Sequence, residues 1–133
     1  MGPTRRRAWA KIVVVDDERL IREVLGAVLS AAGYEVRLVR SGFEALGQLE
    51  RGGVELVFLG ARLPGLGGWR ALGRIRQRHP ALKVVLMSEN ADRGRALAAG
   101  AVAVLEKPYS PARVLAALDE AMASEAPGAR RAG

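Results

Sequence analysis

The sequence has 133 residues and no cysteine, and 50% of its residues are hydrophobic while 26% are charged. This length and composition indicate one globular domain with a sizeable core, and they exclude disulfides and thiolate metal sites. The net charge of +7 belongs mostly to the two ends, because residues 8 to 125 hold 16 of the 21 basic residues and all 14 acidic ones.

The N-terminal segment, residues 1 to 8, is expected to be a basic flexible lead-in, because it combines Gly2 and Pro3 with three arginines. Contact with nucleic acid or acidic lipid is one interpretation of those arginines, and a solvated tail is the simpler one. No secretory signal follows and no apolar run is long enough to span a membrane. We therefore expect a cytoplasmic protein without membrane insertion.

The first predicted strand is the apolar run over residues 12 to 15, which ends in Asp16, Asp17 and Glu18. Adjacent carboxylates at the end of a buried strand repel one another, so a cation or a basic side chain is expected between them. An alternative is that these acidic residues cap the following helix and favour its dipole. That helix is predicted from apolar residues at helical spacing and ends at Gly33.

Residues 35 to 40 alternate polar and apolar side chains, which indicates an edge strand with one exposed face. Ser41 and Glu44 then have the spacing of a capping box, in which both side chains accept hydrogen bonds from free backbone amides. They predict a second helix that runs to about Arg51.

The apolar run over residues 54 to 59 ends at Gly60 and opens into a loop that contains Pro64 and Gly65. Because both faces of this strand are apolar, helices are expected on both faces of the sheet. In such sheets ligands bind beyond the carboxyl ends of the strands, which is where Gly60 lies.

The third predicted helix spans Trp69 to Arg78, and Arg70, Arg74 and Arg78 follow one another at intervals of four residues. Such a basic stripe is usually a solvated helix face, and an acidic partner or DNA is the alternative. His79 receives no function, because no second histidine accompanies it for a zinc site.

The remaining elements complete an alternating pattern. A strand over residues 84 to 87 ends at Ser88, whose hydroxyl can bind an anion or cap the next turn. A short helix over about residues 92 to 99 and a strand over residues 102 to 105 follow. The last helix starts at Ser110–Pro111.

Five strands alternating with five helices predict an α/β fold, a single doubly wound (βα)5 flavodoxin-like domain over residues 9 to 125. With the strand at 35 to 40 on an edge, the expected order of the parallel sheet is 2-1-3-4-5. Residues 126 to 133 are expected to form a disordered tail. The crevice at the sheet edge then gathers five residues: Asp16, Asp17, Gly60, Ser88 and Lys107.

These positions resemble the motifs of response-regulator receiver domains of two-component signal transduction. Asp16–Asp17 are similar to the acidic pair of that family, Ser88 to its Ser/Thr, and Lys107–Pro108 to its Lys-Pro. The resemblance also implies that the Lys107–Pro108 peptide bond is cis. In the family, the acidic pair and an acceptor aspartate hold Mg²⁺, and the aspartate takes the phosphoryl group. The resemblance assigns the remaining protein ligand of the metal to the backbone of Arg62.

The sequence departs from the family pattern at three positions. Gly60 replaces the acceptor aspartate, Val104 replaces the switch Tyr or Phe, and Glu89 replaces a small residue. Together they imply an atypical receiver, or pseudo-receiver, that is not phosphorylated, is not an enzyme, and acts as a protein–protein interaction module. Mg²⁺ binding is expected to be weak or lost. Lys107 or Arg62 is expected to reach Asp16 and Asp17, or Glu89 to pair with Lys107.

By analogy with the family, partners are expected to bind the fourth helix, fifth strand and fifth helix, a surface represented by Arg93, Arg95, Glu106, Tyr109 and Arg113. The expected partner is a protein of a signalling pathway, such as a histidine kinase or an effector, and a homodimer is an alternative. The sequence contains no output domain, so a signal leaves by docking, or the sequence is a piece of a longer protein.

Three alternatives stay open. Asp16, Asp17 or Ser88 can serve as a substitute phosphoacceptor, although displaced geometry disfavours in-line transfer. The ends of the chain and the Arg70/Arg74/Arg78 stripe can bind nucleic acid, which predicts steep salt dependence; we do not expect this. Gly60 can also be an artificial change in a working receiver, which Val104 and Glu89 argue against. No motif of another enzyme class is present.

Overall fold

The computed structural model describes residues 10–90 and 92–125, so the lead-in predicted for residues 1 to 8 and the tail predicted for residues 126 to 133 lie outside the described residues. No helix within the described ranges combines the length and the apolar character needed to cross a membrane. The elements alternate as predicted: β1 (Lys11–Val15), α1 (Arg19–Ala31), β2 (Glu35–Val39), α2 (Gly42–Glu50), β3 (Val54–Gly60), α3 (Gly68–Arg78), β4 (Lys83–Ser88), α4 (Arg93–Ala98), β5 (Ala103–Glu106) and α5 (Pro111–Ala123).

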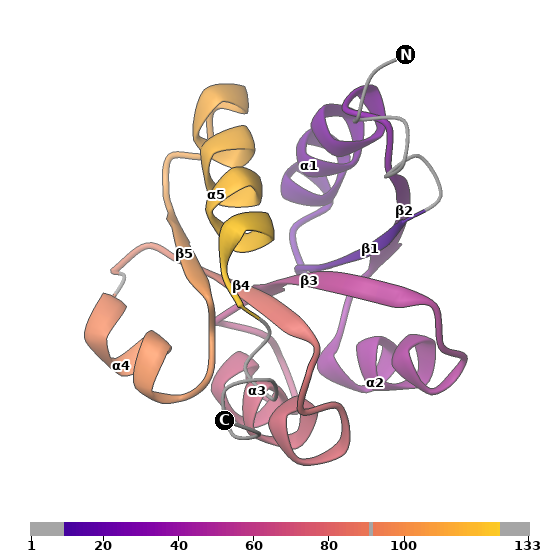
Figure 1. The fold of residues 1–133 in the computed structure, drawn as a ribbon, viewed down its shortest axis with the longest axis vertical. Helices are drawn as coiled ribbons and strands as arrows, with labels where there is room; N and C mark the ends of the chain where they lie inside the picture. Colours follow the sequence, from indigo (N-terminus) through magenta and orange to yellow (C-terminus); the bar gives the residue numbers. More distant parts are fainter. Residues whose placement is uncertain (1–9, 91, 126–133) are drawn as a thin grey trace.

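The strands form one parallel sheet in the order β2-β1-β3-β4-β5, which confirms the predicted topology (Figure 1). Val14 of β1 pairs with Phe58 of β3, and Phe58 pairs with Val85 of β4, so the centre of the sheet is apolar throughout. The order of the strands reverses between β1 and β3. Ligands of doubly wound sheets bind outside the carboxyl ends of the strands at such a switch point.

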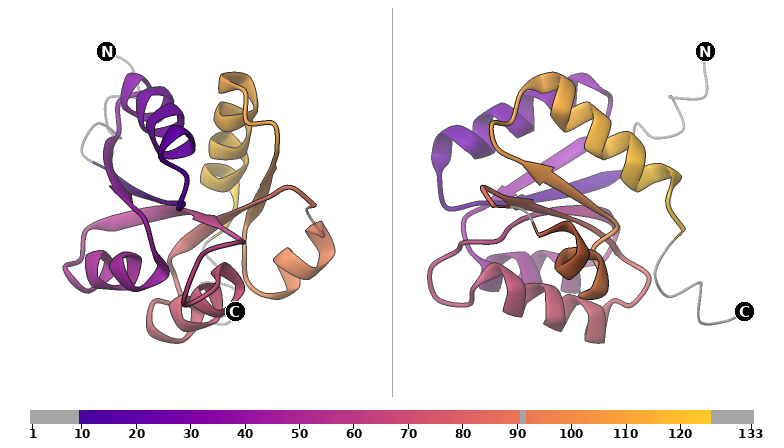
Figure 2. Two further views of the ribbon diagram at one scale, coloured as in Figure 1. Left: turned by 180° about the vertical axis from the view of Figure 1, so that it is seen from behind. Right: turned by 90° about the vertical axis from the view of Figure 1, so that its left-hand side faces the viewer.

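Helices cover both faces of the sheet, with α1 and α5 on one side and α2, α3 and α4 on the other (Figures 1 and 2). The alternation of side chains along each strand divides the core accordingly. In β1, Ile12 and Val14 pack toward α1 and α5, whereas Val13 and Val15 pack toward the opposite layer. This sandwich explains why the central strands are apolar on both faces while β2, at the edge, keeps polar side chains.

The capping predictions have two different outcomes. Ser41 Oγ accepts a hydrogen bond from the Glu44 N–H at 3.1 Å, and Glu44 Oε1 accepts one from the Arg40 N–H at 2.8 Å, so a capping interaction starts α2 as predicted. The same prediction for α1 is wrong, because its N-cap residue Glu18 makes no side-chain cap and its first turn has no acidic residue. Asp16 lies too early to cap the helix.

Candidate functional site

A cavity of about 270 Å³ opens at the carboxyl end of the sheet. It contains all five residues that the sequence predicted to gather, although their chemical roles stay predictions. The residues that line it come from the ends of four strands and the loops that follow them: Asp16, Asp17, Glu18, Gly60, Ala61, Arg62, Met87, Ser88, Glu89, Lys107 and Tyr109.

Asp16 is the buried carboxylate of this cavity, with 6% of its surface exposed, whereas Asp17 is exposed. Asp16 Oδ1 accepts a hydrogen bond from the Glu18 N–H at 2.9 Å, which forms the turn between β1 and α1. Burial raises the pKa of Asp16, and the negative charges of Asp17 and Glu18 act in the same direction, against the Glu18 N–H and the Lys107 charge. The ionised form of the Asp16 carboxylate therefore destabilises the folded state.

Gly60 is buried at the end of β3, and its surroundings leave little room for a side chain. A Cβ atom there would lie 3.0 Å from Asp16 Oδ2, 3.2 Å from the Val15 carbonyl oxygen and 3.4 Å from Leu63 Cδ2. Any larger residue therefore requires the Asp16 carboxylate to move by a few tenths of an ångström. The position offers neither a nucleophile nor a ready space for one.

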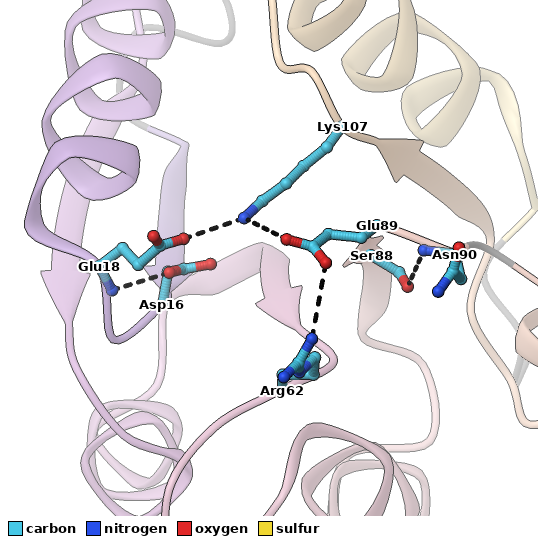
Figure 3. A network of polar contacts seen from close by, with 7 residues as sticks. All are labelled: Asp16, Glu18, Arg62, Ser88, Glu89, Asn90 and Lys107. Carbon is cyan, nitrogen blue, oxygen red and sulfur yellow. Dashed lines mark hydrogen bonds and ion pairs between the residues drawn. The ribbon is translucent and has the colours of Figure 1, made fainter.

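Four charged side chains from four loops form an ion-pair network across the cavity (Figure 3). Lys107 Nζ donates hydrogen bonds to Glu18 Oε1 at 3.0 Å and to Glu89 Oε2 at 3.3 Å. Arg62 Nη1 lies 3.5 Å from the second oxygen of the Glu89 carboxylate, Oε1. Glu18 is the main reason that the pKa of Lys107 is raised, and Glu89 adds to it. The network ties the ends of β1, β3, β4 and β5 together.

This network corrects one sequence-based expectation and confirms another. Neither Lys107 nor Arg62 forms an ion pair with Asp16 or Asp17 within residues 10–90 and 92–125. Both pair with Glu89, so the expected Glu89–Lys107 pair is confirmed. The sequence reasoning missed Glu18 as a site residue, although its position directly after the acidic pair was the available signal.

Ser88 caps the turn after β4, because its Oγ accepts a hydrogen bond from the Asn90 N–H at 3.1 Å (Figure 3). Val104 is only partly buried and packs against the core layer under α2, α3 and α4. A branched aliphatic residue thus occupies the predicted switch position. The Lys107–Pro108 peptide bond is cis, as the resemblance implied.

The residues of the predicted partner surface lie in different environments. Glu106 and Arg113 are exposed, whereas Arg93 pairs with Glu120 of α5. The Arg95 guanidinium lies 3.8 Å from the centre of the Trp69 ring, so it leans toward α3. Tyr109 is half-buried and lines the cavity, and this burial is the main reason that its pKa is raised.

The described part of the chain holds no group of three or more His, Cys, Asp or Glu side chains placed to bind a metal ion. Asp16 and Asp17 supply two carboxylates, and Gly60 supplies none. Four acidic and two basic side chains line the cavity, so its lining carries a net negative charge.

A doubly wound five-stranded sheet with an acidic pair, a serine and a Lys–cis-Pro step at its carboxyl edge defines the receiver class of α/β domains. The chain belongs to the response regulator receiver domain family, whose pattern matches residues 12–119.

Curated relatives are longer than this chain. It is 33% identical over 108 residues to the regulatory protein VanRc of Enterococcus gallinarum, covering 80% of this chain and 47% of that protein. It is 35% identical over 127 residues to the response regulator protein FleR of Pseudomonas aeruginosa, covering 93% of this chain and 27% of that protein. The chain thus spans less than half the length of each.

Solved structures share the fold. A segment of NtrX from Brucella abortus superposes with a TM-score of 0.78 and 34% identity, over 86% of this chain and 27% of that chain. Chemotaxis response regulator CheY4 of Vibrio cholerae superposes with a TM-score of 0.80 over 85% of this chain and 98% of that one. At 24% identity, CheY4 supports the fold alone.

Proposed function

We propose that this receiver domain acts without phosphorylation, as a protein–protein interaction module of two-component signalling. The observation that carries this proposal is Gly60 at the acceptor position, with Asp16 Oδ2 only 3.0 Å from the place of a Cβ atom. Phosphoryl transfer to a receiver needs a carboxylate aligned with the leaving group, and glycine has no side chain to align.

The ion-pair network supports the same proposal. Lys107 stands at the position that the family uses for the phosphoryl group, and here it already has two carboxylate partners, Glu18 and Glu89. Exposed ion pairs contribute only about 0–1 kcal/mol each, so the network competes with an incoming anion without excluding it. The Glu89 carboxylate thus takes over part of the electrostatic role of a phosphoryl group.

Val104 supports independence from phosphorylation in a second way. The family couples phosphorylation to the movement of an aromatic side chain, and Val104 has no ring to rotate inward. We infer that the balance between the two receiver conformations is set by the sequence and by bound partners rather than by phosphorylation, because a ligand shifts such a balance only by binding one conformation more tightly.

The substitute acceptors have weak support. Asp16 Oδ1 is engaged by the Glu18 N–H, and Ser88 Oγ is engaged by the Asn90 N–H. Asp17 is exposed, and none of the three lies at the end of β3. With two carboxylates left for a metal, we expect Mg²⁺ to bind weakly, since this ion usually keeps several waters and relies on carboxylates and phosphates.

The proposed partner is a protein of the same signalling pathway, a histidine kinase or an effector, and a second copy of the chain is the alternative. The proposed contact surface is formed by α4, β5 and α5, where Glu106 and Arg113 are exposed. We propose that residues 9 to 125 form the folded unit and that this unit is located in the cytoplasm.

Titration with Mg²⁺ and beryllium fluoride, a mimic of the acyl phosphate, tests this proposal by ¹H–¹⁵N NMR. We expect no saturable shift of the amides of Gly60, Ser88 and Lys107, because the mimic needs an acceptor carboxylate. The variant Gly60→Asp is the positive control. Saturable shifts in the unaltered chain that extend to Val104 would show a functioning switch and overturn the proposal.

A further inference from the structure

The outward side of α3 carries charge that the proposed function does not use. The inward side of α3 carries the buried residues Ala71, Leu72 and Ile75. The helix lies on the sheet face opposite α1 and α5 (Figure 2). Its other side exposes five residues, and we call the first four of them the α3 basic face: Arg70, Gly73, Arg74, Gln77 and Arg78.

The arginines of this face have no counter-charge in the described part of the chain. The side chains of Arg70 and Arg74 form no hydrogen bond and no ion pair there, and α3 itself contains no acidic residue. Arg76 donates to the carbonyl oxygens of Pro80 and Leu82, which leaves its charge without a carboxylate. Within residues 10–90 and 92–125, only Arg78 of this helix has an acidic partner, Glu50 Oε2 at 3.5 Å.

The residues on either side of the α3 basic face favour a protein partner over a nucleic acid. On the α4 side, the guanidinium of Arg95 lies 3.8 Å from the Trp69 ring centre and covers one face of the indole. This contact occupies a surface on which a nucleic-acid base would stack. On the α2 side, Glu50 adds a negative charge that repels a continuous polyanion but suits a protein surface of mixed charge.

We propose that the α3 basic face is a docking surface for an acidic segment of a protein partner, separate from the surface formed by α4, β5 and α5. Arg70 and Arg74 lie about one helical turn, roughly 6 Å, apart, which matches carboxylates at i and i+4 on a partner helix. Gly73 lies beside them, and no atom from outside its own stretch of helix lies within 4 Å of the place of its Cβ atom, so a partner backbone can approach closely.

A short glutamate-rich helical peptide with carboxylates at i and i+4 tests this docking surface. With the ¹⁵N-labelled chain at low salt, we expect saturable amide shifts confined to α3 and the neighbouring Arg95. The double variant Arg70→Glu/Arg74→Glu is expected to weaken binding about tenfold, because it replaces two attractive charges by repulsive ones. The neutral variant Arg70→Gln/Arg74→Gln should fall between the two.

Arg19→Glu is the matched control, since Arg19 is an exposed helical arginine of α1, on the opposite face of the sheet and outside both proposed surfaces, and its only ion pair among the described residues is the exposed one with Glu23. We expect it to change affinity by less than about twofold. Unchanged affinity of the Arg70→Glu/Arg74→Glu variant, or shifts that map elsewhere, would overturn the proposal. Tighter binding of a single-stranded oligonucleotide of equal charge at the same amides would overturn the assignment to a protein. No phosphodonor is used, so either result leaves the proposed function to its own test.

Discussion

Replacing Gly60 by aspartate is expected to lower the free energy of unfolding at neutral pH and without divalent metal by about 3 kcal/mol. The site is buried, and the new carboxylate would start from a Cβ atom 3.0 Å from Asp16 Oδ2. Burial already raises the pKa of Asp16, so a second carboxylate beside it meets the same loss of solvation together with direct repulsion. Urea denaturation of the two chains measures the difference.

Gly60→Asn is the matched control for this substitution, because it adds nearly the same volume without the charge. The difference between the two variants should shrink as the pH falls to about 4, since buried carboxylates with a raised pKa then bind protons and stop destabilising the folded state. Mg²⁺ should stabilise the aspartate variant more than the asparagine variant. Equal stability of both variants at neutral pH without metal would contradict the expected crowding.

Replacing Gly68 by alanine is expected to lower the free energy of unfolding by about 3 kcal/mol. A Cβ atom on Gly68 would lie 2.0 Å from the Gly60 carbonyl oxygen and 2.7 Å from Ala61 Cα, so the backbone itself must move. The same contact brings the Gly68 N–H within 3.1 Å of the Ala61 carbonyl oxygen, which ties the start of α3 to the end of β3. We therefore expect the substitution to displace the loop that carries Arg62.

Gly73→Ala is the control for Gly68→Ala, because both change a glycine of α3 to the same residue. Gly73 is exposed, and no atom from outside its own stretch of helix lies within 4 Å of the place of its Cβ atom. Its replacement should stabilise the chain by about 0.5–1 kcal/mol through helix propensity. Urea denaturation of both variants gives the comparison, and a Gly68→Ala variant as stable as the unaltered chain would refute the close approach.

The arrangement of elements followed from local patterns. Apolar runs without interruption marked the central strands, and the polar alternation over residues 35 to 40 marked β2 as the edge. The start of α1 was the exception. Asp16–Asp17–Glu18 fits both a helix cap and a turn, and the choice depends on which backbone amide Asp16 meets, namely that of Glu18. A single sequence does not contain that geometry.

The sequence predicted which residues gather at the site, but only in part which of their side chains contact one another. The carboxyl ends of parallel strands meet at one edge, which brought Asp16, Ser88 and Lys107 together as expected. The pairing of Lys107 with Glu89 was among the sequence-based expectations, but long charged side chains have several partners within reach, so its pairing with Glu18 needed three-dimensional positions. For the same reason, the stacking of Arg95 on Trp69 was not predicted.

The most direct test of the central proposal is the intact mass of the chain after incubation with a small-molecule phosphodonor and Mg²⁺, beside the Gly60→Asp variant. We expect the unaltered chain to keep its mass and the variant to gain one phosphoryl group, which would identify Gly60 as the reason that the unaltered chain is not phosphorylated. A phosphoryl group on the unaltered chain would contradict the proposed independence from phosphorylation, and would show that another residue accepts the phosphoryl group.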